Sequence, residues 1–252
     1  MDLQRLSVQS RLAGTILLGV VAATLLPGCG GGIDFGGDVR VPAEQQHVIK
    51  AEQHTNAPLS LPADHRFNIH IKRSSQDLAA EGQARGESNA TADGQAYASA
   101  SAANGGSATA MFQIGHRLDN ESGQVQSVAI EVQFDLVQEI KASQQPEPHT
   151  IAKADLHLVI LDTHRRTVAK TTLIQATSDD AISSATGSQR RTVTATFEPN
   201  QSYDVVLFAQ VEAATDSGQE AVAQIDVKNL QMIFTFASVA RQASAAKHEA
   251  GK

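Results

Sequence analysis

The sequence has few of the residues from which disulfides, thiolate metal sites and sugar-stacking platforms are built. Its 252 residues include one cysteine, no tryptophan and two tyrosines, and aromatic residues make up 4%. A single cysteine excludes an internal disulfide and a thiolate zinc site. Few rings also leave little flat apolar surface for a sugar to stack on. The core must therefore be filled by Val, Ile, Leu and Ala.

Concentrated positive charge is also missing. The net charge is −7, and basic residues gather no further than short pairs such as Arg165-Arg166 and Arg190-Arg191. A nucleic-acid surface needs a strong local positive field, so we expect no nucleic-acid partner.

The N-terminal segment is typical of an export signal. Arg5 and Arg11 are followed by an apolar run over residues 12–26. This run matches a signal-peptide core and is shorter than the roughly 20 residues of a spanning helix. The small residues Val21-Ala22-Ala23 would suit cleavage by an ordinary signal peptidase. The alternative is cleavage between Gly28 and Cys29, which makes residues 1–28 the signal peptide.

The four residues Leu26-Pro27-Gly28-Cys29 resemble the lipobox of bacterial lipoproteins. Leu26, Gly28 and Cys29 fit the pattern, whereas Pro27 replaces the usual Ala, Ser or Thr. The resemblance implies that Cys29 carries lipid and begins the mature chain. It also implies outer-membrane sorting, because Gly30 follows in place of Asp. Several acyl chains anchor a protein stably without a transmembrane helix, so the membrane is an expected partner.

The rest of the chain divides by composition into a tether, a body and a tail. Residues 29–63 contain two glycine clusters and three prolines, which predicts a lipidated N-terminus and flexible tether with one early strand near residues 47–51. Residues 64–237 form the expected β-sandwich domain. Residues 238–252 form a polar tail that we expect to be frayed or partly helical.

Apolar residues recur with a period of two throughout the body, and no window there shows a helical period. The pattern predicts an all-β fold, an antiparallel β-sandwich of about eight to ten strands, with a jelly roll among the possible arrangements. Residues 156–161 are apolar on both faces and predict a central strand. The alternating strands are marked by Phe67, Ile69 and Ile71; Val128 to Leu136; Val193 to Phe197; and Tyr203 to Val211.

Two local features refine this expectation. Ala223, Ile225 and Val227 are apolar at odd positions, whereas Leu230 and the apolar residues after it lie at even positions. A strand cannot change faces without an extra residue, which predicts a β-bulge near Lys228-Asn229.

The biased stretch 86–110 predicts two strands of small residues joined at Asn104-Gly105-Gly106, since Asn-Gly favours a hairpin turn. Loops are expected at residues 142–150 and 179–189.

The body is also similar to β-sandwich ectodomains of bacterial exported surface proteins. The similarity is carried by "AYASASA" early in the body and by "FEPNQSYDVVLFAQVEA" and "AQIDVKNLQMIFTF" late in it. The Pro-Glu-Pro sorting tail of one such group is absent from the C-terminus. The resemblance implies a cell-envelope role in binding, adhesion or assembly.

The sequence contains no motif of a serine hydrolase, a zinc protease or a phosphate-binding loop. We therefore expect no enzyme activity and no cofactor, although a site assembled in space would leave no motif. No pair among the nine histidines has metal-ligand spacing, so surface histidines are expected. Glu131, Asp135, Asp155 and Asp162 are interpreted as solvated strand or turn positions.

Asp226 and Tyr97 are the residues with a ligand-binding interpretation. Asp226 lies in an apolar strand and resembles the calcium position of some jelly-roll carbohydrate-binding modules, but calcium needs six to eight oxygens. The alternative is an outward-facing side chain beside Ile225 and Val227. Tyr97 is the one tyrosine expected to be exposed, because Tyr203 belongs to a core strand.

These observations favour a lipid-anchored cell-envelope β-sandwich protein with a binding, adhesion or assembly role and an unknown protein or glycan ligand. One alternative is a carbohydrate-binding module that uses calcium. A third is a periplasmic hydrolase whose site the sequence does not reveal.

Lipid attachment at Cys29 can be tested directly. Replacing the only thiol, Cys29→Ser, should abolish incorporation of radiolabelled palmitate and release the protein from the membrane fraction, because no other residue can form the thioether. Gly32→Ser, three residues further on, should retain both. Unchanged labelling of Cys29→Ser would contradict the lipobox interpretation.

Overall fold

The computed structural model describes residues 47–49, 57–78, 82–143, 150–178, 184–216 and 218–238. Every described strand belongs to one compact unit, Gly36–Lys252. The expected signal peptide, Cys29, most of the expected tether and the tail beyond Ser238 lie outside these residues.

The described residues form twelve β-strands, and no helix is present within them. The sequence-based count of eight to ten is exceeded by two strands of three residues each. The strands are β1 (His47–Ile49), β2 (Leu59–Leu61), β3 (Ile69–Leu78), β4 (Gln83–Ala90), β5 (Ala96–Ala103), β6 (Gly106–Asn120), β7 (Gln126–Ala142), β8 (Ile151–Leu161), β9 (Thr167–Thr177), β10 (Ser184–Phe197), β11 (Gln201–Ala214) and β12 (Glu220–Ser238). None of the described segments could cross a bilayer as an apolar helix.

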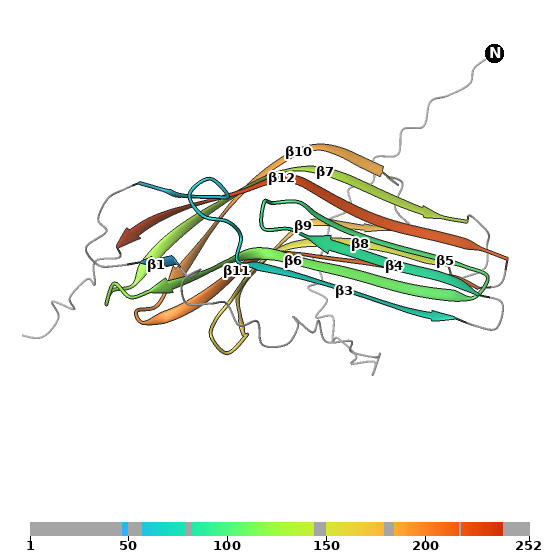
Figure 1. Ribbon diagram of the computed structural model, residues 1–252, viewed down its shortest axis with the longest axis horizontal. Helices are drawn as coiled ribbons and strands as arrows, with labels where there is room; N and C mark the ends of the chain where they lie inside the picture. The colour runs from blue at the N-terminus through green and yellow to red at the C-terminus, as the bar shows by residue number, and fades with distance from the viewer. Residues whose placement is uncertain are drawn as a thin grey trace, which may run out of the picture. The chain divides into compact units, whose positions relative to one another are not determined.

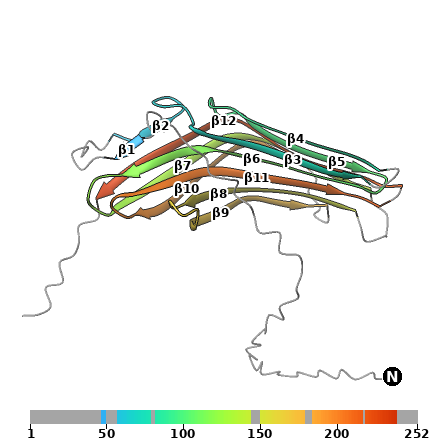
Figure 2. The ribbon, with the colours of Figure 1, turned by 60° about the horizontal axis from the view of Figure 1, so that its bottom comes forward.

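The strands pair into two six-stranded sheets (Figures 1 and 2). Sheet A has the order β1-β6-β11-β8-β9, and β3 pairs with β6 on the same edge as β1. Sheet B has the order β10-β7-β12-β5-β4, and β2 pairs with β12. All pairs are antiparallel except β1 with β6. The predicted β-sandwich is confirmed, and β8 is an interior strand of sheet A, as the apolar run over residues 156–161 predicted.

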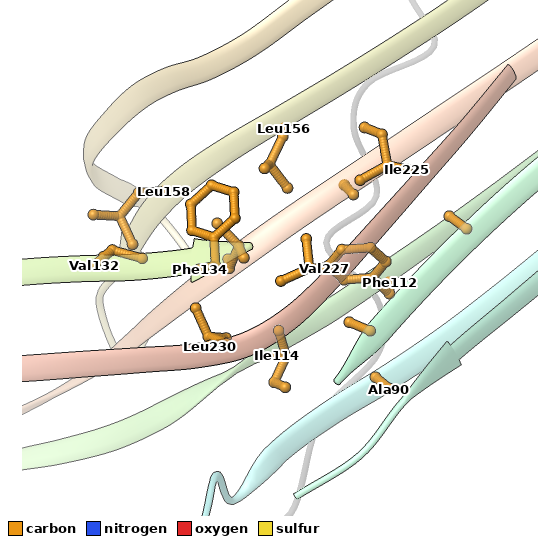
Figure 3. Close-up of a cluster of buried hydrophobic side chains, with 14 of the residues drawn as sticks. Ala90, Phe112, Ile114, Val132, Phe134, Leu156, Leu158, Ile225, Val227 and Leu230 are labelled. Carbon is orange, nitrogen blue, oxygen red and sulfur yellow. The ribbon is translucent and has the colours of Figure 1, made fainter. Parts of the chain in front are cut away.

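The two sheets enclose one apolar core (Figure 3). The two-residue period decides which side chains enter it, because alternate positions of a strand point to opposite faces. Phe112 and Ile114 come from β6, and Phe134 from β7 faces them across the sandwich, each at most 2% exposed. Leu156 and Leu158 from β8 complete the part of the core with the largest side chains.

Toward the other end of the sandwich the core side chains become small. The buried positions there are Ala98, Ala100, Ala102, Ala108, Ala110, Ala152, Ala154, Ala213, Ala221 and Ala223, which come from both sheets. Alanine side chains on both faces allow the sheets to approach closely. A Cβ at Gly86 would lie 2.6 Å from the Thr109 carbonyl oxygen. The biased composition of residues 86–110 therefore encodes a thin packed layer and not a linker.

The predicted bulge in β12 is confirmed. Lys228 pairs with Asp135 of β7 and Gln231 pairs with Gln133, so β12 holds one extra residue in this interval. Asn229 adopts φ 53°, a conformation that asparagine tolerates better than most residues. Ala223, Ile225 and Val227 before the bulge and Leu230, Met232 and Phe234 after it are all buried.

The turn at Asn104-Gly105 has the predicted positive φ angles, 54° and 85°. It does not close a hairpin, because β5 lies in sheet B and β6 in sheet A. The prediction failed because the turn residues fix only local geometry, whereas the alanine faces of both strands turn toward the core. The true hairpin joins β4 to β5 through residues 91–95, where Gly94 has φ 91° and accepts a hydrogen bond from the Leu230 amide (3.1 Å).

Three further boundaries differ from expectation or refine it. The early strand near residues 47–51 is present as β1. The expected tether also contains β2, whose Leu59 and Leu61 are buried in the core, so the sandwich begins before residue 64. Residues 184–189, expected in a loop, belong to β10, which pairs with β7 along its whole length. β10 is an edge strand of sheet B with mostly polar side chains, so apolar alternation in the sequence did not indicate its first residues.

The thin alanine layer gives a stability prediction. Ala100→Leu should lower the free energy of unfolding by about 1–3 kcal/mol, since the buried Ala100 leaves no room for three more carbon atoms. Ser99→Leu, on the opposite face of the same strand, should change it by much less. Urea denaturation measures both, and equal effects would show that the sheets are not tightly packed there.

Candidate functional site

The bulge in β12 borders a hollow on the outer face of sheet B. The hollow has a volume of about 360 Å³, and most of the residues that line it have polar side chains. β7, β10 and β12 contribute these polar side chains, namely Gln133, Asp135, Ser188, Arg190, Asn229 and Gln231. Strand pairing brings them together from segments up to about a hundred residues apart in sequence, so no sequence motif marks the site.

Asp135 is at the centre of the hydrogen bonds in this hollow. The Ser188 hydroxyl donates to Asp135 Oδ1 at 2.5 Å, and Asn229 Nδ2 donates to Asp135 Oδ2 at 2.8 Å. The hydrogen bonds from Ser188 and then from Asn229 hold the pKa of Asp135 below its ordinary value. Asp135 is therefore a hydrogen-bonded carboxylate at neutral pH, on the outer strand face where the sequence predicted it.

Glu131 lies one outward position from Gln133 on β7 and forms a second charged group beside the hollow. Arg190 Nη2 donates to Glu131 Oε2 at 2.7 Å, and Gln133 donates to Oε1. The hydrogen bond from Arg190, followed by that from Gln133, lowers the pKa of Glu131, and the same ion pair raises the pKa of Arg190.

This set of groups suits recognition better than proton transfer. Both carboxyl groups have lowered pKa values, whereas a general acid needs a raised one. Amides, carboxylates and a guanidinium supply both donors and acceptors to a polar ligand. The arrangement can bind hydroxyl, amide or charged groups, and the lining offers no exposed ring for stacking.

Tyr97 and Asp226 lie on the same outer face, away from the hollow. They are register partners, and Asp226 also pairs with Val137, which is 38% exposed. Tyr97 is half-buried and less exposed than expected. The Asp226 side chain points outward, and its Oδ2 forms an ion pair with Lys228 Nζ at 3.1 Å. Within the described ranges, no three His, Cys, Asp or Glu side chains gather as metal ligands.

The expectation that the histidines lie at the surface is wrong for two of them. His157 is 7% exposed, and its ring lies parallel to Phe208 at 6.3 Å between centroids. Burial, followed by the charge of Lys170, lowers the pKa of His157, although Asp155 acts in the opposite direction. His116 is 1% exposed and its ring lies 6.4 Å from that of His65. His157 lies between Leu156 and Leu158, in the apolar run that predicted a strand covered on both faces, whereas His116 lies between Gly115 and Arg117, where the sequence gives no sign of burial.

The remaining residues named from the sequence have structural roles or lie outside the described ranges. Tyr203 belongs to the core, as expected, where its ring stacks on Phe197 at 4.0 Å and its hydroxyl accepts the Glu198 amide. Asp162 accepts the amides of His164 and Arg166 and so organises the turn after β8. Cys29 lies outside the described residues.

No family model and no curated protein matches this chain. Among solved structures, the enzymatically active domain of bacteriophage CBA120 tailspike protein 4 is 12% identical, with a TM-score of 0.27, over 66% of this chain and 19% of that one. A carbohydrate-binding module of the β-sandwich superfamily is 9% identical, with a TM-score of 0.23, over 66% and 57%. A structure of infectious bursal disease virus, Gt strain, is 9% identical, with a TM-score of 0.25, over 74% and 38%.

This chain therefore spans less than two thirds of each of these three proteins. Such distant matches carry no argument about a ligand. The β-sandwich assignment rests on the strand pairing itself.

The contacts of Asp135 predict its titration. Carboxyl-selective NMR should give Asp135 a pKa below the ordinary value of about 3.9. Ser188→Ala should raise it most and Asn229→Ala less, in the order of their contributions. A lowered pKa means that Asp135 adds stability above its unfolded pKa, which is lost as the pH falls through the folded value. Ser184→Ala, further along β10, should leave the titration unchanged.

Proposed function

We propose that this chain is an exported, lipid-anchored protein of a bacterial envelope, whose β-sandwich acts as a binding module. The export signal and Cys29 in the sequence support the anchoring part of the proposal. The polar hollow at the β12 bulge supports the binding part, and it is the observation on which the proposal depends.

The hollow has two features of a binding site. Its centre is held in place before any ligand arrives, because Asp135 is hydrogen-bonded on both oxygens from neighbouring strands. Its side chains are also accessible, since Ser188, Asn229 and Gln231 are exposed. A bulge is a common device for redirecting a side chain next to a functional site, and here it aims Asn229 at Asp135.

Among possible ligands, the chemistry of the lining favours a hydroxyl-rich one such as a glycan. Sugar hydroxyls both donate and accept hydrogen bonds, and Asp135, Gln133 and Arg190 offer both kinds of group within one hollow. Because Phe134, the aromatic residue of the lining, is 2% exposed and packs in the core, we expect a binding mode dominated by hydrogen bonds and of modest affinity. A protein ligand is the other possibility.

A glycan array probed with the purified chain carrying Cys29→Ser tests the site. At least one glycan should bind, and Gln231→Ala or Asn229→Ala should weaken that binding about tenfold, the effect of about 1.4 kcal/mol of lost hydrogen bonding. Gln224→Ala is the matched control, because Gln224 is on the outer face of the same strand beyond the hollow. Equal loss in all three variants would place the ligand elsewhere on sheet B.

Two further results separate the alternatives. Loss of binding on addition of EDTA would support the calcium-dependent module, and Asp226→Asn would then identify whether Asp226 is a ligand. Absence of binding to every glycan would exclude the carbohydrate interpretation and leave a protein ligand as the candidate.

A further inference from the structure

The outer face of sheet B has a second hollow, at the alanine end of the sandwich. It has a volume of about 320 Å³ and is lined by residues of β4, β5 and β12. Strand register explains why it forms, because Ser101 and Ala103 of β5 have short side chains that point outward. The strands on both sides carry longer side chains in the same rows, namely Gln83 and Arg85 on β4 and Glu220 and Val222 on β12. The short residues are therefore the floor of a trough between two walls.

This trough continues along β5 toward the bulge in β12. Ser99 is the next outward residue after Ser101, and Tyr97 follows Ser99. Tyr97 is half-buried, and its ring lies where the run of short side chains ends. The distance along the strand from Ala103 to Tyr97 is about 20 Å. We call the outward face of β5 from Ala103 to Tyr97 the β5 trough.

One row of the sheet lies between the β5 trough and the hollow at the bulge. In this row Asp226 pairs with Tyr97 on one side and with Val137 of β7 on the other. Val137 is 38% exposed, and the next outward residue of β7 is Asp135, at the centre of the hollow. A ring and an apolar side chain therefore lie between two polar hollows. The path through both hollows is about 30 Å long.

The charges along this face are arranged in pairs. Every Lys and Arg side chain that points outward from β4, β5, β7, β10 and β12 forms an ion pair with a carboxylate, and the pairs are Arg85–Glu87, Lys141–Glu139, Lys228–Asp226 and Arg190–Glu131. The outward carboxylates of these strands that are not in such a pair are Asp135 and Glu220. The face therefore has no excess of positive charge that would attract a polyanion. An uncharged ligand fits it better.

The polar groups of the β5 trough suit the hydroxyls of a sugar. Ser99 and Ser101 offer hydroxyls, and Gln83 and Gln224 beside them offer amides, so donors and acceptors alternate across the trough. Tyr97 adds the flat apolar surface that the hollow at the bulge lacks. A sugar has hydroxyls on its edge and an apolar ring face. A chain of sugars repeats both features along its length, as this path does.

We propose that the outer face of sheet B binds a linear, uncharged polysaccharide, which runs from the β5 trough past Tyr97 and Val137 to the hollow at the bulge. The inference rests on the proposed function, because it takes that hollow to be one end of a glycan site. It adds the class of ligand, a polymer and not a single terminal sugar. Simultaneous contacts along one chain raise the affinity above that of either hollow alone.

The dependence of affinity on oligosaccharide length tests this inference. The chain carrying Cys29→Ser is titrated by calorimetry with linear glucan, xylan, mannan and chitin oligosaccharides, each from the disaccharide to the hexasaccharide. In at least one of these series the affinity should rise by about tenfold or more with length, because longer chains reach both hollows. The hexasaccharide of galacturonic acid should bind more weakly than that series, because the face has no excess positive charge.

Two variants test the path itself. Ser101→Gln fills the trough and Tyr97→Ala removes the ring, so each should weaken hexasaccharide binding about tenfold. Both should leave the affinity for the disaccharide unchanged, since it occupies the hollow alone. Tyr97→Phe keeps the ring and should retain binding. Ser127→Gln is the matched control, because Ser127 points outward from β7 beyond the hollow, where it pairs with Thr196.

The urea midpoints of both variants should equal that of the parent, and Ser99→Gln replaces Ser101→Gln if that variant is less stable. An affinity that does not depend on length, but is still lowered by Asn229→Ala, would overturn this inference and leave the hollow as a site for a single sugar. So would hexasaccharide binding that Ser101→Gln does not change, or tighter binding of the acidic hexasaccharide. Absence of binding both here and on the glycan array would refute the carbohydrate part of the proposed function as well.

Discussion

One extra residue in β12 connects the packing of this protein to its surface chemistry. Before the bulge, odd-numbered residues of β12 enter the core, and after it even-numbered ones do, so both halves of the longest strand stay buried on one face. The bulge also gives Asn229 its positive φ and brings its amide to Asp135 on the outer face. A strand without the insertion would lose either half of its core contacts or the side chain that closes the hollow.

The core around this strand is built from side chains of two sizes. Phenylalanine and branched aliphatic residues fill one end, and alanines from both sheets fill the other. The low aromatic content of the sequence is consistent with this arrangement, because a thin alanine layer has no space for rings. The same alanine layer explains why residues 86–110, whose composition resembles a linker, form strands with buried alternate positions.

The surface chemistry is consistent with binding. Neighbouring strands hold Asp135 and Glu131 as carboxylates, and the hydrogen bonds that lower their pKa values also fix their orientation. The outer face of sheet B carries this polar hollow, whereas the outer face of sheet A carries the buried side chains of Val159, Val206 and Phe208. A lipid anchor at Cys29 would place this module at a membrane surface.

The sequence alone determined the features that depend on short-range pattern. The two-residue period gave the all-β class and the core faces of β7, β8 and β11, and the change of parity after Val227 located the bulge to within a residue. Pattern along one strand cannot report which strands become neighbours. Pairing therefore decided that Asn104-Gly105 crosses between sheets, that His116 is buried, and that residues 184–189 extend β10. It also decided that Asp135, Ser188 and Asn229, which no motif links, meet in one hollow, because that meeting depends on the register of three strands.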